Sequence, residues 1–180
     1  MIITLMGYMG SGKSIVSNEL SYKIRFKNID LDNEISSEIG LSIPEIFQKK
    51  GELFFRKKEK EILERILSMQ EDVVLSLGGG TPCYYNNIDL INERSVSVYL
   101  VANVNALVKN ILYEREKRPL IAGIKEEELP NFIGQHLMER NQYYSKAKIA
   151  VMVNNWDLDR IVSDILTEIE KLGYKTKNKN

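Results

Sequence analysis

An α/β fold with a mostly parallel sheet is the architecture that this sequence predicts, and three observations support it. Apolar segments of strand length alternate with amphipathic segments of helix length along the chain. The first apolar segment is followed by the glycine-rich stretch GYMGSGKS and then by an amphipathic segment, an order typical of parallel α/β proteins. The chain has 180 residues, a usual length for one compact domain, so a single domain over residues 1–180 is expected.

The first half of the chain contains two predicted strands. Ile2–Met6 is a continuous apolar run, as in a strand that is buried on both faces, and Lys27–Asp30 is a shorter strand that ends in an acidic residue. The segments between and after them have the length and pattern of helices. These predicted helices are Lys13–Arg25, Asn33–Ile39, Ile43–Lys49 and Glu52–Ser68.

The second half repeats the alternation. Its predicted strands are the apolar runs Val73–Leu77, Val96–Val101 and Ile149–Val153. Amphipathic segments follow each strand, as expected when helices cover both faces of a parallel sheet. These predicted helices are Asn86–Asn92, Asn105–Tyr113, Glu127–Ser145 and Asp157–Leu172.

Two segments fit neither pattern. Residues 114–126 (EREKRPLIAGIKE) are charged, contain a proline and a glycine, and interrupt the helical segments. They are either a solvated loop or a mobile lid over a site. The polar tail Lys175–Asn180 (KTKNKN) is expected to fray.

The composition narrows the class of protein. Lys and Arg total 25, as do Asp and Glu, so the formal net charge is zero and a general binder of nucleic acid or of anionic membranes is not expected. The longest apolar runs fall far short of the roughly 18 residues that span a membrane, and the N-terminus lacks a signal-peptide pattern. Cys83 is the single cysteine, so no internal disulfide can form. We expect a cytoplasmic monomer.

The stretch GYMGSGKS matches the phosphate-loop pattern G-x-x-x-x-G-K-[ST], with Gly7, Gly12, Lys13 and Ser14 at the defining positions. Its glycines let backbone N–H groups curl around a phosphate, and the N-terminus of the following helix adds partial positive charge. Lys13 can reach the β- and γ-phosphates, and the Ser14 hydroxyl can bind Mg²⁺. The residues expected to bind the nucleotide here are Gly10, Ser11, Gly12, Lys13, Ser14 and Ile15.

An acidic strand end supplies the carboxylates that such a site needs. The strand Val73–Leu77 carries Ser76 where phosphate-loop proteins usually have a magnesium-binding aspartate, so the charge must come from elsewhere. The sequence IDLD places Asp30 and Asp32 at alternate positions, which project to one side if the segment is extended. We assign Asp30 to Mg²⁺, through water, and Asp32 to the acceptor hydroxyl. The alternative is that Asp32 only caps the helix that follows it.

The glycine triplet Gly78–Gly80 follows the same strand. A plain turn needs only one or two glycines, so a turn alone does not explain three. Glycines at a strand end often allow a ligand or another backbone to come close. The triplet therefore predicts that a ligand or another chain segment comes close to this backbone.

Several motifs together resemble those of the shikimate kinase family over nearly the whole chain. They are GYMGSGKS, the DLD pair, GELFFRKKE at residues 51–59, SLGGG at 76–80, KRPLIAG at 117–123 and ERNQYY at 139–144. The resemblance implies transfer of the ATP γ-phosphoryl group to the 3-hydroxyl of shikimate, with Mg²⁺, in the route to aromatic amino acids. It also implies a three-layer α/β/α fold with a five-stranded sheet of order 2-3-1-4-5, a lid at about 114–126 and a small helical substrate-binding subdomain at about 32–62.

The resemblance also assigns roles to individual residues. Asp32 matches the family's aspartate on the shikimate hydroxyls, and Arg56 and Arg140 match its carboxylate-binding arginines. Glu59 resembles an acid that orients the arginine and the aspartate. Arg118 matches a lid arginine over the phosphates, so Asp32, Lys13 and Arg118 form the expected catalytic set. The remaining expected substrate contacts are Gly78, Gly79, Gly80, Phe47 and Phe55.

Part of the adenine site departs from the family pattern. Many members carry an arginine stacked on adenine where this chain has Ile111. Its substitute is either Asn110, Arg115 or the loop of residues 154–156, in which Asn155 is our candidate nucleotide contact. Cys83 has no assigned role and is expected to be a bystander near the site, and His136, the only histidine, is expected to be structural or exposed.

Three other functions compete with this interpretation. A kinase of the same fold could act on a sugar acid such as gluconate, but the arginine pair beside the glycine triplet favours shikimate. A GTP-dependent switch would need an N-K-x-D motif to bind guanine, and the sequence contains none. A nucleotide-binding regulator without catalytic activity would not release ADP when shikimate is added.

Overall fold

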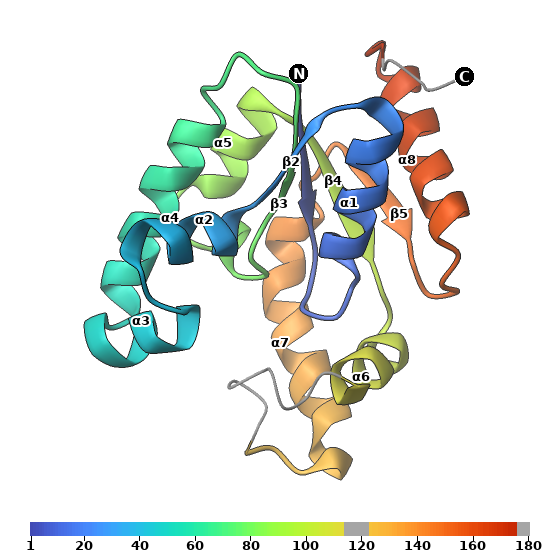
Figure 1. Ribbon diagram of the computed structural model, residues 1–180. Coiled ribbons are helices and arrows are strands. Elements are labelled where there is room, and N and C mark those ends of the chain that lie inside the picture. The colour runs from blue at the N-terminus through green and yellow to red at the C-terminus, as the bar shows by residue number, and fades with distance from the viewer. Residues whose placement is uncertain (114–122, 176–180) are drawn as a thin grey trace.

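A five-stranded parallel sheet forms the centre of the molecule in the computed structural model, which describes residues 1–113 and 123–175 (Figure 1). Its strand order is β2-β3-β1-β4-β5, so the predicted order 2-3-1-4-5 is confirmed. All four strand pairs are parallel. Ser76 is in register with Asp30 of one neighbouring strand and with Leu5 of the other. The strands are β1 (Ile2–Met6), β2 (Lys27–Asp30), β3 (Val73–Ser76), β4 (Val96–Val101) and β5 (Ile149–Met152).

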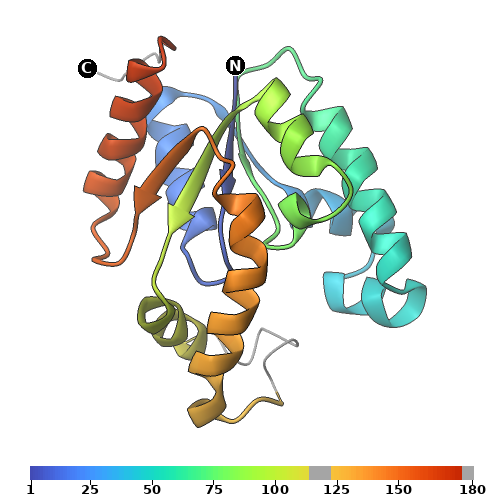
Figure 2. The same ribbon diagram turned by 180° about the vertical axis from the view of Figure 1, so that it is seen from behind.

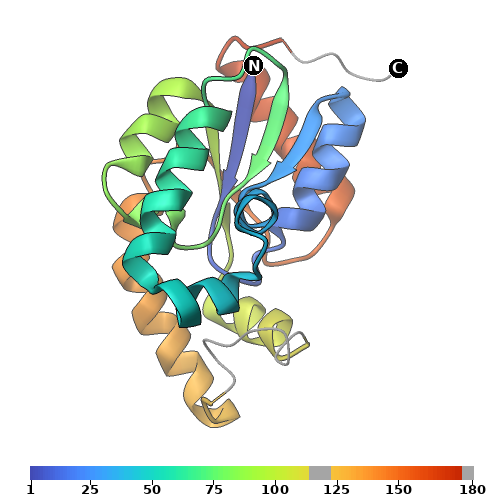
Figure 3. The same cartoon turned by 60° about the vertical axis from the view of Figure 1, so that its left-hand side comes forward.

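Helices cover both faces of the sheet. Figure 3 shows α1 and α8 on one side and α4, α5 and α7 on the other, and Figure 2 shows α5 and α7 in front of the sheet when it is seen from behind. The predicted three-layer α/β/α arrangement is therefore confirmed. The α-helices are α1 (Lys13–Ile24), α2 (Leu31–Ile39), α3 (Ile43–Lys50), α4 (Glu52–Ile66), α5 (Asn87–Arg94), α6 (Val104–Tyr113), α7 (Leu129–Tyr144) and α8 (Leu158–Lys171), and the 3₁₀ helices are η1 (Thr81–Cys83) and η4 (Glu126–Glu128).

Burial follows from this layering. The central strands β1 and β3 are buried at every position, because helices pack on both of their faces. The edge strand β5 instead alternates between buried and exposed residues. Among the described residues, no helix is long and apolar enough to cross a bilayer.

The start of α2 corrects one step of the sequence interpretation. The helix begins at Leu31, two residues earlier than predicted, so Asp32 lies in its first turn and not in an extended segment. The residue that caps the helix is Asp30, whose side chain accepts a hydrogen bond from the Asn33 backbone N–H at 3.1 Å. The short polar side chain of Asp30 satisfies one of the free N–H groups at the helix start, which is why the helix begins there. The alternative in which Asp32 is the cap is therefore wrong.

The two arms of the molecule lie beyond the carboxyl edge of the sheet, where ligands bind in open α/β folds. In Figure 1, α2, α3 and the beginning of α4 form one arm, and α6 with the first half of α7 forms the other. The loops that follow β1, β2 and β3 all begin at this edge. This edge therefore brings together the phosphate loop, the aspartates and the glycine triplet.

Candidate active site

A cavity of about 570 Å³ opens at the carboxyl edge of the sheet. Its lining comes from five parts of the chain: the phosphate loop with the start of α1, the β2–α2 junction, the end of β3, α6 and the β5–α8 loop. The lining residues are Met9, Gly10, Gly12, Lys13, Ser14, Ile15, Asp30, Asp32, Ser76, Leu77, Gly79, Lys109, Asn110 and Trp156.

The phosphate loop has the backbone that its glycines predict. Gly7, Gly10 and Gly12 have φ angles of 152°, 81° and 85°, which residues with a Cβ rarely adopt. Gly12 is the N-cap of α1 and provides no side-chain cap, so the first N–H groups of the helix are left for a ligand. The Lys13 ammonium donates to the backbone oxygens of Gly7 at 2.9 Å and Tyr8 at 3.0 Å, and so lies across the loop.

Ser14 and Asp30 face each other at the cavity wall. The Ser14 hydroxyl lies 3.5 Å from Asp30 Oδ2, and both residues line the cavity. Ser76 stands beside Asp30 in the β2–β3 register, so the neighbouring strand supplies the carboxylate that Ser76 lacks. A hydroxyl and a carboxylate are oxygen ligands of the kind that Mg²⁺ prefers, with water and nucleotide phosphates completing its shell. These residues therefore fit a magnesium site.

Asp32 lines the cavity in an unusual electrostatic environment. Burial first, and then the neighbouring carboxylates of Asp30 and Glu59, raise the pKa of its carboxyl to about 6, against the opposing effect of Lys13 and Arg56. Carboxylates with a pKa near the working pH are suited to accept or share a proton. The position next to the phosphate loop makes Asp32 a candidate base.

Each glycine of the triplet gives room to a different charged side chain. A Cβ at Gly78 would lie 2.9 Å from Asp32 Oδ1. A Cβ at Gly79 would lie 3.3 Å from Arg140 Nη1, and one at Gly80 would lie 2.8 Å from Arg56 Nη2. None of the three glycines has a positive φ, so backbone conformation does not require them. The triplet therefore holds the aspartate and both arginines close to one short backbone segment.

The two arginines differ in their partners. Arg56 donates to Glu59 at 2.8 Å through Nη1 and to Glu52 at 3.4 Å through Nε. Glu59 is buried and accepts a second bond from the Thr81 hydroxyl at 2.7 Å, as expected for an acid that orients Arg56. No carboxylate lies within ion-pair distance of Arg140 in the part of the chain that the structure describes.

The model of the shikimate kinase family matches residues 9–170 of this chain. The chain belongs to the shikimate kinase family. The predicted family is confirmed, and the match includes all the motifs described above except the first two residues of the phosphate loop.

Individual members of the family are similar over nearly their full length. A shikimate kinase from Flavobacterium johnsoniae is 44% identical over 165 residues, which are 91% of this chain and 96% of that protein. The crystal structure of shikimate kinase from Bacteroides thetaiotaomicron superposes with a TM-score of 0.88 at 30% identity and covers 97% of this chain and 99% of its own. Shikimate kinase from Acinetobacter baumannii in complex with shikimate gives a TM-score of 0.87 at 29% identity, with 97% and 95% covered.

The remaining predicted residues fall into three groups. The cavity lining contains Gly10 and Gly12 of the phosphate loop and Ile15, which follows it. Arg56, Phe47 and Phe55 lie outside this lining. The Arg56 guanidinium lies beside Gly80. The two phenylalanine rings pack on each other at 4.6 Å. Arg118 and Arg115 lie outside the described residues, as does most of the predicted lid.

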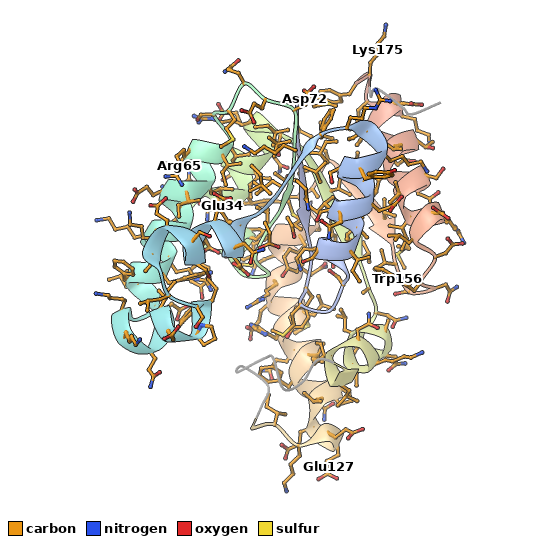
Figure 4. The ribbon with its side chains drawn as sticks, in the orientation of Figure 1. Glu34, Arg65, Asp72, Glu127, Trp156 and Lys175 are labelled. Carbon is orange, nitrogen blue, oxygen red and sulfur yellow. The ribbon has the colours of Figure 1, made fainter. Side chains whose placement is uncertain are left out.

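The adenine side of the cavity differs in detail from the prediction. Asn155 does not line the cavity, and its neighbour Trp156 does. Figure 4 shows Trp156 on the loop between β5 and α8, and its ring lies against Gly12 of the phosphate loop. Ile111 is fully buried and its side chain packs against Gly10. Asn110 donates to the Gly10 backbone oxygen at 2.8 Å, and of these two residues only Asn110 lines the cavity. Trp156 is the single tryptophan of the chain, and its large aromatic side chain in this loop is the sequence signal that points to this contact.

The residues without an assigned site role behave as structural groups. The Tyr8 hydroxyl and His136 Nδ1 share a hydrogen bond of 2.9 Å, which favours the structural one of the two alternatives predicted for this histidine. The buried Tyr144 donates from its hydroxyl to the Gly79 backbone oxygen at 2.5 Å, a contact that the sequence analysis missed. Burial raises the pKa of the half-buried Cys83 thiol, which agrees with a bystander.

Adding one methyl group to the triplet is expected to affect the binding of the acceptor and to leave nucleotide binding unchanged. For Gly79→Ala, the new Cβ meets the end of the flexible Arg140 side chain, so we expect the shikimate KM to rise several-fold. For Gly80→Ala, it meets a guanidinium that Glu59 holds in place, so we expect a larger rise. Shikimate kinetics and nucleotide titration on the same preparations test both. Equal weakening of both ligands, or loss of the fold, would contradict this expectation.

Proposed function

We propose that the protein transfers the γ-phosphoryl group of ATP to the 3-hydroxyl of shikimate, giving 3-phosphoshikimate and ADP, in the route to chorismate and the aromatic amino acids. The observation that carries the proposal is the convergence of Asp32, Arg140 and Arg56 on the glycine triplet beside the phosphate loop. Shikimate is a cyclic triol with one carboxylate, so it needs both cationic and hydroxyl-binding partners.

On the nucleotide side, Lys13 and the N–H groups at the start of α1 hold the phosphates. Ser14 and Asp30 bind Mg²⁺, Asp30 through water, and the ion when bound neutralises charge on the β- and γ-phosphates. The Ser11 hydroxyl is buried with no hydrogen-bond partner among the described residues, which supports a ligand on this loop. Trp156, in place of Asn155, is the residue that we assign to the purine side. Arg118 keeps its sequence-based assignment over the phosphates.

On the acceptor side, Arg140 and Arg56 bind the carboxylate, since planar guanidinium groups pair with carboxylates through two parallel hydrogen bonds. Phe47 and Phe55 supply the apolar wall, and the triplet backbone lies along the ring. These contacts turn the 3-hydroxyl toward the γ-phosphorus. Alignment of this kind supplies most of the catalysis in phosphoryl transfer, because the transition state is loose.

Asp32 is the group that we place on the 3-hydroxyl. Its carboxylate orients the hydroxyl and accepts its proton as the bond to phosphorus forms, and its raised pKa suits that step. Because Asp32 acts from its ionised form, activity is expected to increase with pH through about 6.

The setting of the enzyme is also part of the proposal. We infer a cytoplasmic monomer with one kinase domain, a substrate-binding subdomain at about 32–62 and a lid at about 114–126. Arg56 and the two phenylalanines come from the first of these segments, which supports its assignment to the acceptor.

A coupled assay of ADP release tests the function. We expect turnover that requires both shikimate and Mg²⁺ and stops when EDTA is added. Gluconate and nucleoside monophosphates at the same concentration serve as controls for other kinases of this fold. Equal turnover with gluconate, or none with shikimate, would exclude the proposed substrate.

A further inference from the structure

Tyr84 makes the closest aromatic contact with the Arg56 guanidinium. The ring centroid lies 3.8 Å from Arg56 Cζ, whereas those of Phe55 and Phe47 lie at 4.9 and 5.9 Å. A distance of 3.8 Å is that of a direct stack of the planar guanidinium on the ring. Tyr84 is half-buried, and the Arg56 side chain is 11% exposed, so little water separates the two.

The Tyr84 hydroxyl holds a second neighbour of the same arginine. It donates to Glu52 Oε1 at 2.7 Å, and Arg56 Nε donates to the same oxygen at 3.4 Å. This hydrogen bond is the main cause that lowers the pKa of Glu52. Glu52, Tyr84 and Arg56 therefore form a closed set, in which the ring contacts the guanidinium face and the carboxylate contacts one edge.

The chain directs Tyr84 to this place through the glycine triplet. Gly80 is followed by η1, and Tyr84 is the extended residue that ends this 3₁₀ helix. Arg56 Nη2 lies against Gly80, so the same short segment contacts the arginine at its edge through Gly80 and on its face through Tyr84. Nη1 and Nε are directed to Glu59 and Glu52, which leaves the guanidinium with a fixed plane and a fixed rotation.

We propose that Tyr84 is a positioning residue for the acceptor's carboxylate, which it serves by stacking on Arg56 and fixing the plane of its guanidinium. A stack uses the face of the guanidinium and no N–H group, so it leaves available for an anion the N–H groups that do not donate to Glu52 or Glu59. This inference rests on the proposed function, in which Arg56 binds the shikimate carboxylate. It makes the aromatic ring, more than the hydroxyl, the part of Tyr84 that determines affinity for an anionic acceptor.

Two substitutions separate the ring from the hydroxyl. Tyr84→Leu removes the stack and is expected to raise the shikimate KM by about five- to thirtyfold, with kcat and the ATP KM unchanged within about twofold. Tyr84→Phe keeps the stack and is expected to stay within about threefold of the unaltered protein. If the phenylalanine variant is as weak as the leucine variant, the hydrogen bond to Glu52 carries the effect and the stacking role is wrong.

The adjacent tyrosine provides a matched control. Tyr85 is exposed, and its ring lies 5.2 Å from the Lys60 ammonium, so it is also next to a cation but not next to Arg56. Tyr85→Leu should leave the shikimate KM within about twofold. A rise equal to that of Tyr84→Leu would show that loss of any tyrosine in this segment disturbs the site, and would overturn the proposal.

A neutral acceptor tests whether Tyr84 acts through the carboxylate. The methyl ester of shikimate has no charge for Arg56 to bind, so Tyr84→Leu should not raise its KM relative to the unaltered protein. A rise of the same size with the ester would place Tyr84 elsewhere in the site and overturn the proposal. Absence of shikimate turnover by the unaltered protein would contradict the proposed function, whereas normal turnover with an unchanged leucine variant would contradict only the role of Tyr84.

Discussion

Replacing Arg140 by alanine is expected to reduce kcat/KM for shikimate by roughly 30-fold to several thousand-fold, which corresponds to about 2–5 kcal/mol for a desolvated charge pair. Arg140 is half-buried, lies over the Tyr8 ring at 5.5 Å and contacts the glycine triplet. Its charge has no ion-pair partner within the described residues, unlike that of Arg56. The carboxylate of the substrate therefore meets a cation that no acid among the described residues has already neutralised.

Two control variants test whether the effect is specific to the guanidinium of Arg140. One is a lysine at the same position, and the other removes an exposed arginine elsewhere. Arg140→Lys keeps the charge and loses the planar fork, so the shikimate KM should rise much more than the ATP KM, but less than in the alanine variant. Arg160→Ala, on the exposed surface of α8, should change neither constant. Steady-state kinetics with each substrate varied provide both values. An unchanged shikimate KM in both Arg140 variants would remove this residue from the site.

Asp32→Asn is expected to lower kcat by roughly 10²–10⁴ while ATP and Mg²⁺ still bind. The amide cannot accept the proton of the 3-hydroxyl, although it fills the same space in the first turn of α2. Asp30→Asn is the matched control, since it should weaken binding of ATP with Mg²⁺ first. A drop in kcat of less than tenfold for Asp32→Asn would indicate that Asp32 only orients the hydroxyl. Loss of nucleotide binding in that variant would indicate that the roles of the two aspartates are exchanged.

The free energy of unfolding of the same Asp32→Asn variant at pH 7 is expected to be about 1–2 kcal/mol higher than that of the unaltered protein. Burial and the neighbouring carboxylates raise the pKa of Asp32 to about 6, so its ionised form destabilises the folded state at neutral pH. As the pH falls from about 6 to about 4, the folded protein takes up this proton before the unfolded chain does, and the difference should shrink. Urea unfolding at pH 7 and pH 4.5 measures it. A difference that grows on acidification would contradict the assigned pKa.

The local elements of this protein could be predicted from the sequence, because their signals lie within short continuous segments. The apolar run Ile2–Met6 has the character of a strand buried on both faces, and the structure buries all of it. The segment of residues 7–14 contains Gly7, Gly10 and Gly12, and all three have positive φ angles in the structure. Glycine adopts such angles readily because it has no Cβ, so this backbone could be expected from the residue type alone. The order of the sheet, in contrast, was known only through the resemblance to a family.

The contacts between segments were decided by the tertiary structure alone. The tertiary structure explains the glycine triplet, because three charged side chains from different helices lie against it. These are Asp32 of α2, Arg140 of α7 and Arg56 of α4. Similarly, Asp30 and not Asp32 caps α2, because the helix starts where a side chain satisfies its free N–H groups. Trp156 and not Asn155 reaches the cavity, because the direction of each side chain in a loop depends on the packing beneath it. Local pattern determines which elements form, whereas packing at the carboxyl edge of the sheet determines which side chains meet there.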